Sequence, residues 1–176
     1  MFQIILVVIA SIIGLFLLAG LIMKKTFVIT SQTTINRSKD EVFNYIKLIK
    51  NQEYYSKWVM ADPNLDLTYT GTDGTAGFTA AWKSELKNVG VGEQEIKKIT
   101  EGEGYEAEIR FEKPFKGVSH AKTIAESISD NQTKFTTIFT SRSKFPLNVM
   151  TSIICKMVQR NMDENSGNLK RVLEQQ

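Results

Sequence analysis

The sequence has little of the chemistry on which many catalytic and metal-binding sites depend. Its 176 residues include one cysteine, Cys155, and one histidine, His120. A single cysteine excludes a disulfide framework, and one cysteine with one histidine excludes a zinc site built from these residues. The sequence also lacks a glycine-rich phosphate loop, a Ser-His-Asp order and metal-ligand spacing. We therefore predict no catalytic residue, no metal and no cofactor.

Charge is also missing from the first 23 residues. In residues 1–23 the only positions outside the hydrophobic set are Gln3, Ser11, Gly14 and Gly20. A helix needs about 20 apolar residues to cross the hydrocarbon core of a bilayer. A cleaved secretory signal would have a basic start and small residues before its cleavage site, and this run has neither. We predict an uncleaved, single-pass anchor over residues 1–25, which contacts the membrane through residues 1–23.

The positive charges that follow the apolar run indicate its orientation. Lys24, Lys25, Arg37 and Lys39 follow the run, whereas only the α-amino group precedes it. Because positive flanks stay on the cytoplasmic side, we expect a cytoplasmic globular domain. Lys24 and Lys25 also account for most of the formal net charge of +3. The remaining domain is near neutral and has no basic, aromatic-rich surface, so we expect no nucleic-acid partner.

Hydrophobic periodicity predicts one α+β domain over residues 26–176. A capping box, Ser38 with Glu41, predicts the start of a first helix, and a second short helix is expected over residues 52–58. In residues 105–112 charged and apolar side chains alternate without a break, which is typical of an antiparallel sheet with one buried face. We expect seven strands, at residues 26–35, 65–70, 77–84, 89–99, 104–113, 117–128 and 133–142.

After Phe145-Pro146 the period becomes helical again. Leu147, Met150, Ile153, Ile154, Met157, Val158 and Met162 form an apolar stripe, which Leu169, Val172 and Leu173 continue. We expect a single long helix, bent at Gly167, because glycine weakens a helix. Such a helix must bury its stripe, and only the apolar face of a curved sheet is available. The expected fold is a curved antiparallel sheet wrapped around a long C-terminal helix.

This pattern resembles the START-like, or helix-grip, superfamily, in its polyketide cyclase/dehydrase and lipid transport subset. The resemblance covers about residues 26–176, and an N-terminal anchor also occurs in this group. It rests on the order of several segments, among them Val42-Phe43-Asn44-Tyr45-Ile46, Trp58 with Asp62-Pro63-Asn64, Ala80-Ala81-Trp82, Val89-Gly90-Val91-Gly92 and Lys113-Pro114-Phe115-Lys116-Gly117. It implies a cavity for hydrophobic ligands between the sheet and the last helix. Because the superfamily contains carriers, receptors and cyclases, the fold does not give the function.

Small residues on the strand at residues 117–128 raise the question of what fills such a cavity. The inward positions that larger residues often fill in the superfamily align with Thr123 and Ala125. Since protein interiors tolerate few voids, either a ligand fills the space or bulky neighbours such as Trp82 and Met150 close it. The candidate lining residues, each of which could instead be ordinary core, are Trp58, Tyr69, Phe78, Trp82, Ile109, Phe111, Thr123, Phe135, Thr137, Phe139, Met150, Ile154 and Met157.

These residues are compatible with three functions. The leading hypothesis is a membrane-anchored domain that binds a lipid or another hydrophobic small molecule without catalysis. A cyclase or dehydratase acting on an aromatic or polyketide-like substrate is the alternative, and it needs two inward polar residues near each other. A protein-interaction module with a vestigial cavity is the third.

The single histidine and the single cysteine are not expected to be catalytic. We expect His120 on the solvent-exposed face of its strand and Cys155 buried in the last helix.

Overall fold

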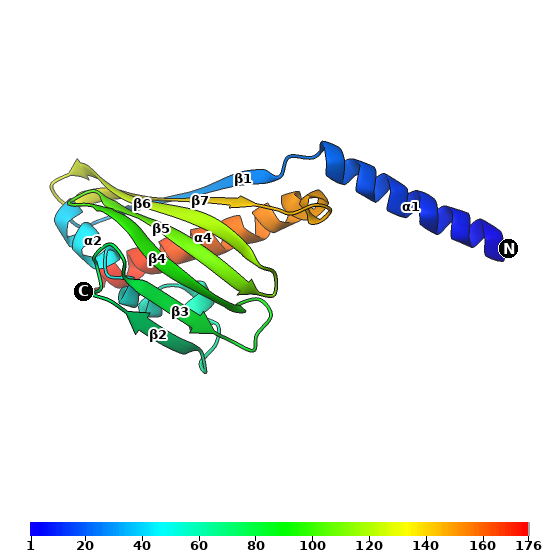
Figure 1. The fold of residues 1–176 in the computed structure, drawn as a ribbon. Helices are drawn as coiled ribbons and strands as arrows, with labels where there is room; N and C mark the ends of the chain where they lie inside the picture. The colour runs from blue at the N-terminus through cyan, green and yellow to red at the C-terminus, as the bar shows by residue number, and fades with distance from the viewer. Residues whose placement is uncertain (176) are drawn as a thin grey trace.

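The computed structural model describes residues 1–175 and contains the expected sheet and helices (Figure 1). The elements are α1 (Phe2–Ile22), β1 (Thr26–Ile35), α2 (Lys39–Ile46), the 3-10 helix η1 (Ile49–Tyr54), α3 (Lys57–Met60), β2 (Asp66–Thr70), β3 (Thr79–Lys83), β4 (Val91–Thr100), β5 (Gly104–Lys113), β6 (Gly117–Ser129), β7 (Gln132–Arg142), the 3-10 helix η2 (Leu147–Met150) and α4 (Thr151–Glu174). Each expected strand is present, with ends that differ by at most two residues.

The seven strands form one antiparallel sheet in the order β1-β7-β6-β5-β4-β3-β2. Its register shifts at Val91/Gly92, at Ile96/Lys98 and at Ser127/Ser129, and such bulges increase bending and twist. At Gly92 a Cβ would lie 2.6 Å from the carbonyl oxygen of Arg110 and 2.7 Å from the Trp82 ring. The absence of a side chain at Gly92 therefore lets β5 and the Trp82 ring approach β4 closely.

The predicted capping box starts α2. The backbone N–H of Glu41 donates to Ser38 Oγ at 3.4 Å, and the N–H of Ser38 donates to the Glu41 carboxylate at 2.9 Å. Val42, Phe43 and Ile46 of α2 are buried. The cap therefore holds this helix against the end of the sheet where β1 finishes.

The long helix α4 lies in the concave side of the sheet and packs along β1 (Figure 1). Its buried residues lie between its middle and its C-terminal end: Met162, Ser166, Leu169 and Leu173. The main core lies at the same end: Ile35, Val42, Ile46, Tyr55, Ala125, Phe135, Leu169 and Leu173 pack together. A second core cluster, which includes Phe78, Ile96 and Tyr105, lies beneath the β2–β5 side of the sheet.

Three expectations about the last helix are wrong in detail. Residues 147–150 form a separate 3-10 turn, so the long helix begins only at Thr151. The bend at Gly167, which lies within α4, stays a prediction. Side chains at the start of the expected buried stripe, Met150, Ile153 and Met157, are exposed because the sheet does not cover the first half of α4. Cys155 is half-buried rather than buried for the same reason. The helix before β2 is also split, into η1 and α3.

The helix α1 projects away from the domain, with the N-terminus at its far end (Figure 1). Its length and composition suffice to cross a membrane, a test that a signal sequence also passes, and almost none of it is buried. Its last turn contacts the domain. There the Asn148 amide donates to the carbonyl oxygens of Gly20 at 2.7 Å and Met23 at 3.0 Å. These bonds satisfy carbonyl groups that a helix end otherwise leaves unpaired.

Candidate functional site

A cavity of about 320 Å³ lies between the sheet and α4. Strands β2 to β7 supply its floor and one wall, α4 supplies the opposite wall, and η1 with α3 closes one side. Its surface is mainly apolar and aromatic, because the inward faces of six strands meet one helix there. The bulky neighbours therefore leave open space beneath α4 rather than closing it.

Nine of the thirteen predicted lining residues contribute to the cavity wall. They are Trp58, Tyr69, Trp82, Ile109, Phe111, Thr123, Phe135, Thr137 and Phe139. The Trp82 ring meets Phe111 edge-on at 5.9 Å, and its Nε1 donates to the carbonyl of Val89 at 3.3 Å. Except for Trp58 on α3, strand alternation places these side chains on one face of the sheet, which is why the sequence pattern could find them. That they bind a ligand stays a prediction.

Four predicted lining residues lie outside the cavity. Phe78 is buried behind the Tyr69 ring, on which it stacks at 5.9 Å. On α4 the cavity is faced by Val158, Met162, Asn165 and Ser166. Met157 points about 100° away from Val158, as helical geometry requires, and is exposed. Met150 and Ile154 lie nearer α1, before the part of α4 that lines the cavity.

Several lining residues escaped the sequence prediction, although some could have been found. Leu65 and Leu67 share the parity of Tyr69, and Tyr105 shares that of Ile109, so alternation alone would have placed them on the same face. Asn165 and Ser166 gave no such signal, because as polar residues they interrupt the apolar stripe of the last helix. In the structure Ser166 Oγ lies 2.8 Å from Ser31 Oγ and donates to the Met162 carbonyl.

The cavity floor contains a small polar group around Tyr105. Its hydroxyl is surrounded by Thr123, Gln52 and Gln94, all of which line the cavity. Burial raises the pKa of Tyr105, and the polar neighbours offset part of that rise. The hydroxyl therefore stays protonated at neutral pH, and this group can donate or accept hydrogen bonds to a ligand inside an otherwise apolar space.

A second polar pair lies where η1 meets β2. The Tyr69 hydroxyl donates to Glu53 Oε1 at 2.5 Å, and both residues contribute to the cavity. Burial, followed by the hydrogen bond to Glu53, raises the pKa of Tyr69. Tyr69 is therefore a hydrogen-bond donor at neutral pH and a poor proton acceptor, since an effective general base has its pKa near the working pH.

Polar contacts tie α3 to α4 beside the cavity. The backbone N–H of Lys57 donates to Asn165 Oδ1 at 2.7 Å, and the Lys57 ammonium pairs with Glu164. One turn further along α4, the Asn168 amide donates to the carbonyl of Tyr55 at 3.2 Å. These contacts fix the position of Trp58 and Val59 against the cavity.

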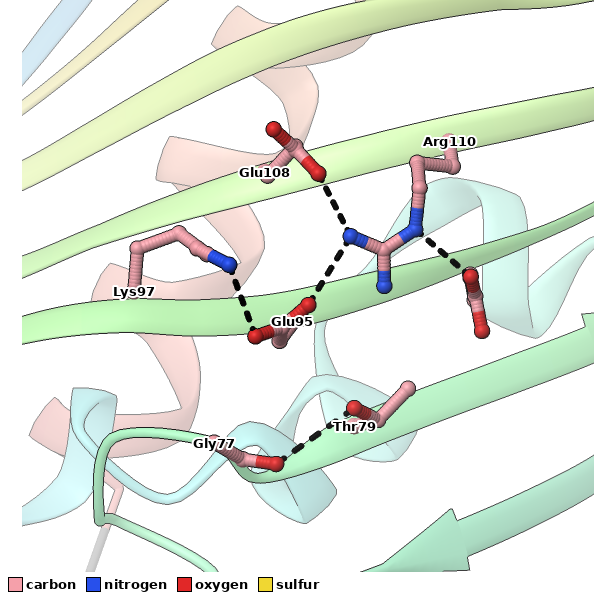
Figure 2. A network of polar contacts seen from close by, with 7 residues as sticks. Gly77, Thr79, Glu95, Lys97, Glu108 and Arg110 are labelled. Atoms are coloured by element: carbon pink, nitrogen blue, oxygen red, sulfur yellow. Dashed lines mark hydrogen bonds and ion pairs between the residues drawn. The ribbon is translucent and has the colours of Figure 1, made fainter.

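Most carboxylates of the sheet lie on its other face. Arg110 pairs with Glu93 at 2.6 Å, with Glu95 at 2.8 Å and with Glu108, while Lys97 pairs with Glu95 (Figure 2). The hydrogen bonds from Lys97 and Arg110 lower the pKa of Glu95. His120 is exposed, as predicted. Within residues 1–175 no three His, Cys, Asp or Glu side chains gather closely enough to hold a metal ion.

Comparison with solved structures identifies the fold. Norcoclaurine synthase from Thalictrum flavum, in complex with dopamine and hydroxybenzaldehyde, matches with a TM-score of 0.64 and 11% identity, over 89% of this chain and 92% of the synthase chain. Ara h 8.0201 matches with a TM-score of 0.54 and 16% identity, over 82% and 97% of the two chains. A protein from Arthrobacter aurescens matches with a TM-score of 0.60 and 19% identity, over 86% and 87%.

The chain has a helix-grip fold. The predicted fold class is therefore confirmed. No protein-family model matches the sequence, and no curated protein matches it either. At identities this low the structural likeness shows the fold alone. The features that bear on function are the cavity and α1.

Proposed function

We propose that this protein is a membrane-anchored helix-grip domain that binds a lipid or another hydrophobic small molecule without catalysis. The cavity of about 320 Å³ carries the proposal. Ligand pockets commonly have volumes of about 300 to 1,000 Å³ and mostly apolar walls with a few placed polar groups. A bound apolar molecule would remove the apolar walls of this cavity from water, which favours binding.

The polar group at the cavity floor narrows the chemistry of the ligand. A pure hydrocarbon could form no hydrogen bond with the four polar residues of this group, Tyr105, Thr123, Gln52 and Gln94. A molecule with an apolar body and one carbonyl or hydroxyl group would satisfy both the walls and this group. Fatty acids and related lipids have this character.

Retention of α1 is supported by its contact with the domain. Asn148 is fully buried, and its amide donates to two carbonyl groups at the end of α1. A buried amide that loses its partners costs about 1–3 kcal/mol, so removal of α1 would leave a defect in η2. This contact favours an anchor over a cleaved signal. With Lys24 and Lys25 after the span, we propose that the domain lies in the cytoplasm.

The enzymatic alternative rests on one pair, Glu53 with Tyr69. The two side chains are joined at the cavity, and norcoclaurine synthase is an enzyme with a similar fold. Against catalysis, the raised pKa values of Tyr69 and Tyr105 keep both hydroxyls protonated, which suits binding better than proton abstraction. We therefore rank a cyclase or dehydratase below a binding protein.

The two tryptophans make binding measurable, because Trp58 and Trp82 both line the cavity. The full chain, held in a lipid nanodisc, is titrated with dibromostearate, whose bromine atoms quench tryptophan on contact. We expect saturable quenching. Ala121→Leu fills part of the cavity and should weaken the quenching. His120→Leu, at the neighbouring outward position of β6, should leave the quenching unchanged.

Native mass spectrometry of the gently purified chain gives a second readout. Co-purified apolar species should be present with the unchanged protein and with His120→Leu, and should be reduced with Ala121→Leu. Unsaturable quenching that is equal in all three proteins, together with no retained apolar species, would contradict the proposal and favour an interaction module.

A further inference from the structure

An apolar surface lies where the domain meets α1. We define the proximal surface as Phe145, Leu147, Met150, Ile153 and Met157, which belong to η2, the segment before it and the first two turns of α4. Ile153 is 67% exposed and Met157 is 57% exposed, and the other three are also exposed. Monomeric soluble domains seldom leave large apolar side chains grouped in this way without a partner.

The proximal surface is fixed to the end of α1. Asn148, in the same turn as Leu147 and Met150, donates to the carbonyls of Gly20 and Met23. The Phe145 ring lies against Gly20, where an added Cβ would come within 3.0 Å of it. Gly20 belongs to the last turn of α1, so Phe145 and η2 lie at the depth of that turn. Wherever α1 leaves a membrane, this surface is beside it.

The two segments that form the proximal surface and its junction with α1 carry only positive charges. Residues 1–36 contain Lys24 and Lys25 and no acidic residue, and residues 141–162 contain Arg142, Lys144, Lys156 and Arg160 and no acidic residue. All six cations are exposed. Basic residues next to a membrane span are attracted to anionic headgroups, and apolar side chains among them can enter the interface.

We propose that the proximal surface docks on the anionic bilayer leaflet from which α1 emerges. The apolar side chains insert between the headgroups, and the six cations pair with lipid phosphates. The domain is then held against the membrane in one orientation instead of moving freely on α1. This inference rests on the anchor in the proposed function, since without an inserted α1 nothing brings the surface to a bilayer.

The experiment uses the full chain in nanodiscs of phosphatidylcholine and phosphatidylglycerol. Cys155→Ser removes the native thiol, and single cysteines are introduced by Ile153→Cys on the proximal surface, Ser11→Cys within α1, or Ile128→Cys. Ile128 is an exposed apolar control at the far end of β6. Each cysteine carries an NBD fluorophore, and spin-labelled phosphatidylcholine is the quencher. Met157→Cys repeats the proximal measurement one turn along α4.

We expect the labels at positions 153 and 11 to be quenched by lipid several-fold more than the label at position 128. Exchanging Lys144 and Lys156 for glutamate should reduce quenching at position 153 in anionic nanodiscs and leave position 11 unchanged. Equal quenching at 153 and 128, with strong quenching at 11, would overturn the docking and leave the anchor in place.

Two further outcomes would also overturn the proposed docking of the proximal surface. A label at position 153 that is shielded from water and not quenched by lipid would mean that a second copy or another protein covers the surface. An unquenched label at position 11 would show that α1 is not inserted in the bilayer, which would overturn both the anchor and the docking. Dibromostearate binding in the cavity would be unaffected by any of these results, so failure of ligand binding is seen separately.

Discussion

The two ends of the sheet differ in how far they bury α4 and in what closes them. At the distal end, where β1 meets α2, the main core is closed by Leu169 and Leu173, and the turns carry acidic residues such as Asp73, Glu101 and Asp130. At the proximal end α1 leaves the domain (Figure 1). There the first two turns of α4 expose apolar side chains among cations. One helix therefore serves two purposes: its second half stabilises the fold, and its first half remains available for contact.

Hydrogen bonds reinforce the same contrast. Distal loops are held by their own polar side chains: the backbone N–H groups of Ile49 and Lys50 donate to the Asp73 carboxylate at 2.8 and 3.1 Å. Thr133 Oγ1 donates to the carbonyl of Arg37 at 2.8 Å. At the proximal end Asn148 instead joins the domain to α1. The distal end is thus self-contained, whereas the proximal end is completed by the apolar helix.

The largest expected effect separates the two halves of α4. Leu169→Ala opens a cavity at a fully buried site and should lower the free energy of unfolding by about 2–5 kcal/mol. Ile153→Ala, on the same helix but exposed, should change it by no more than about 0.5 kcal/mol. Denaturant unfolding in mild detergent, followed by tryptophan fluorescence, measures both. Equal losses would mean that the proximal half also carries the fold.

A smaller effect is expected where the domain meets α1. Asn148→Ala leaves the carbonyls of Gly20 and Met23 without this donor, which should weaken the local contact by about 1–3 kcal/mol. Hydrogen exchange should become faster in residues 19–25 and 145–150, while core amides stay protected. Asn44→Ala, at an exposed position of α2, is the control. Faster exchange throughout the domain would contradict a local role.

The N-cap of α2 at Ser38 should contribute about 1 kcal/mol to the free energy of unfolding. Ser38→Ala removes the side chain that accepts from the Glu41 N–H, and loss of an N-cap costs about that much. Hydrogen bonds to Ser38 lower the pKa of Glu41. Because the folded-state pKa is below the unfolded value, the contribution is present above the unfolded pKa and is lost as pH falls through the folded one.

Unfolding measured from neutral pH into the acid range tests this linkage. The unchanged protein should lose more stability on acidification than Glu41→Gln, which has no carboxylate to titrate. Parallel pH curves for the two proteins would contradict it.

The smallest effect is expected at the proximal cations. Lys144→Gln and Lys156→Gln should each change the free energy of unfolding by no more than about 0.5 kcal/mol, because both side chains are exposed. The same denaturant measurement checks this. A larger loss from either would show that these lysines support the fold, and the contrast between the two ends would then be weaker.

Alternation and helical spacing were sufficient to predict most of the fold. β1 and β5 have the predicted bounds, and the α2 cap is at Ser38. The lining residues on strands followed from parity in the same way. The failures lie on α4, where periodicity identifies an apolar stripe without showing how far the sheet extends to cover it. Met150, Ile154 and Met157 were placed in the cavity for that reason.

The apolar, uncharged α1, the order of the elements and the face of each strand follow from local sequence patterns, because they depend on residues close together along the chain. The positions of Asn165 and Ser166 in the cavity wall, the pairing of Glu53 with Tyr69, and the contact of Asn148 with the end of α1 depend instead on the folded arrangement. Asn148 and Gly20 are 128 residues apart, and contacts at such separations depend on how the curved sheet brings distant segments together.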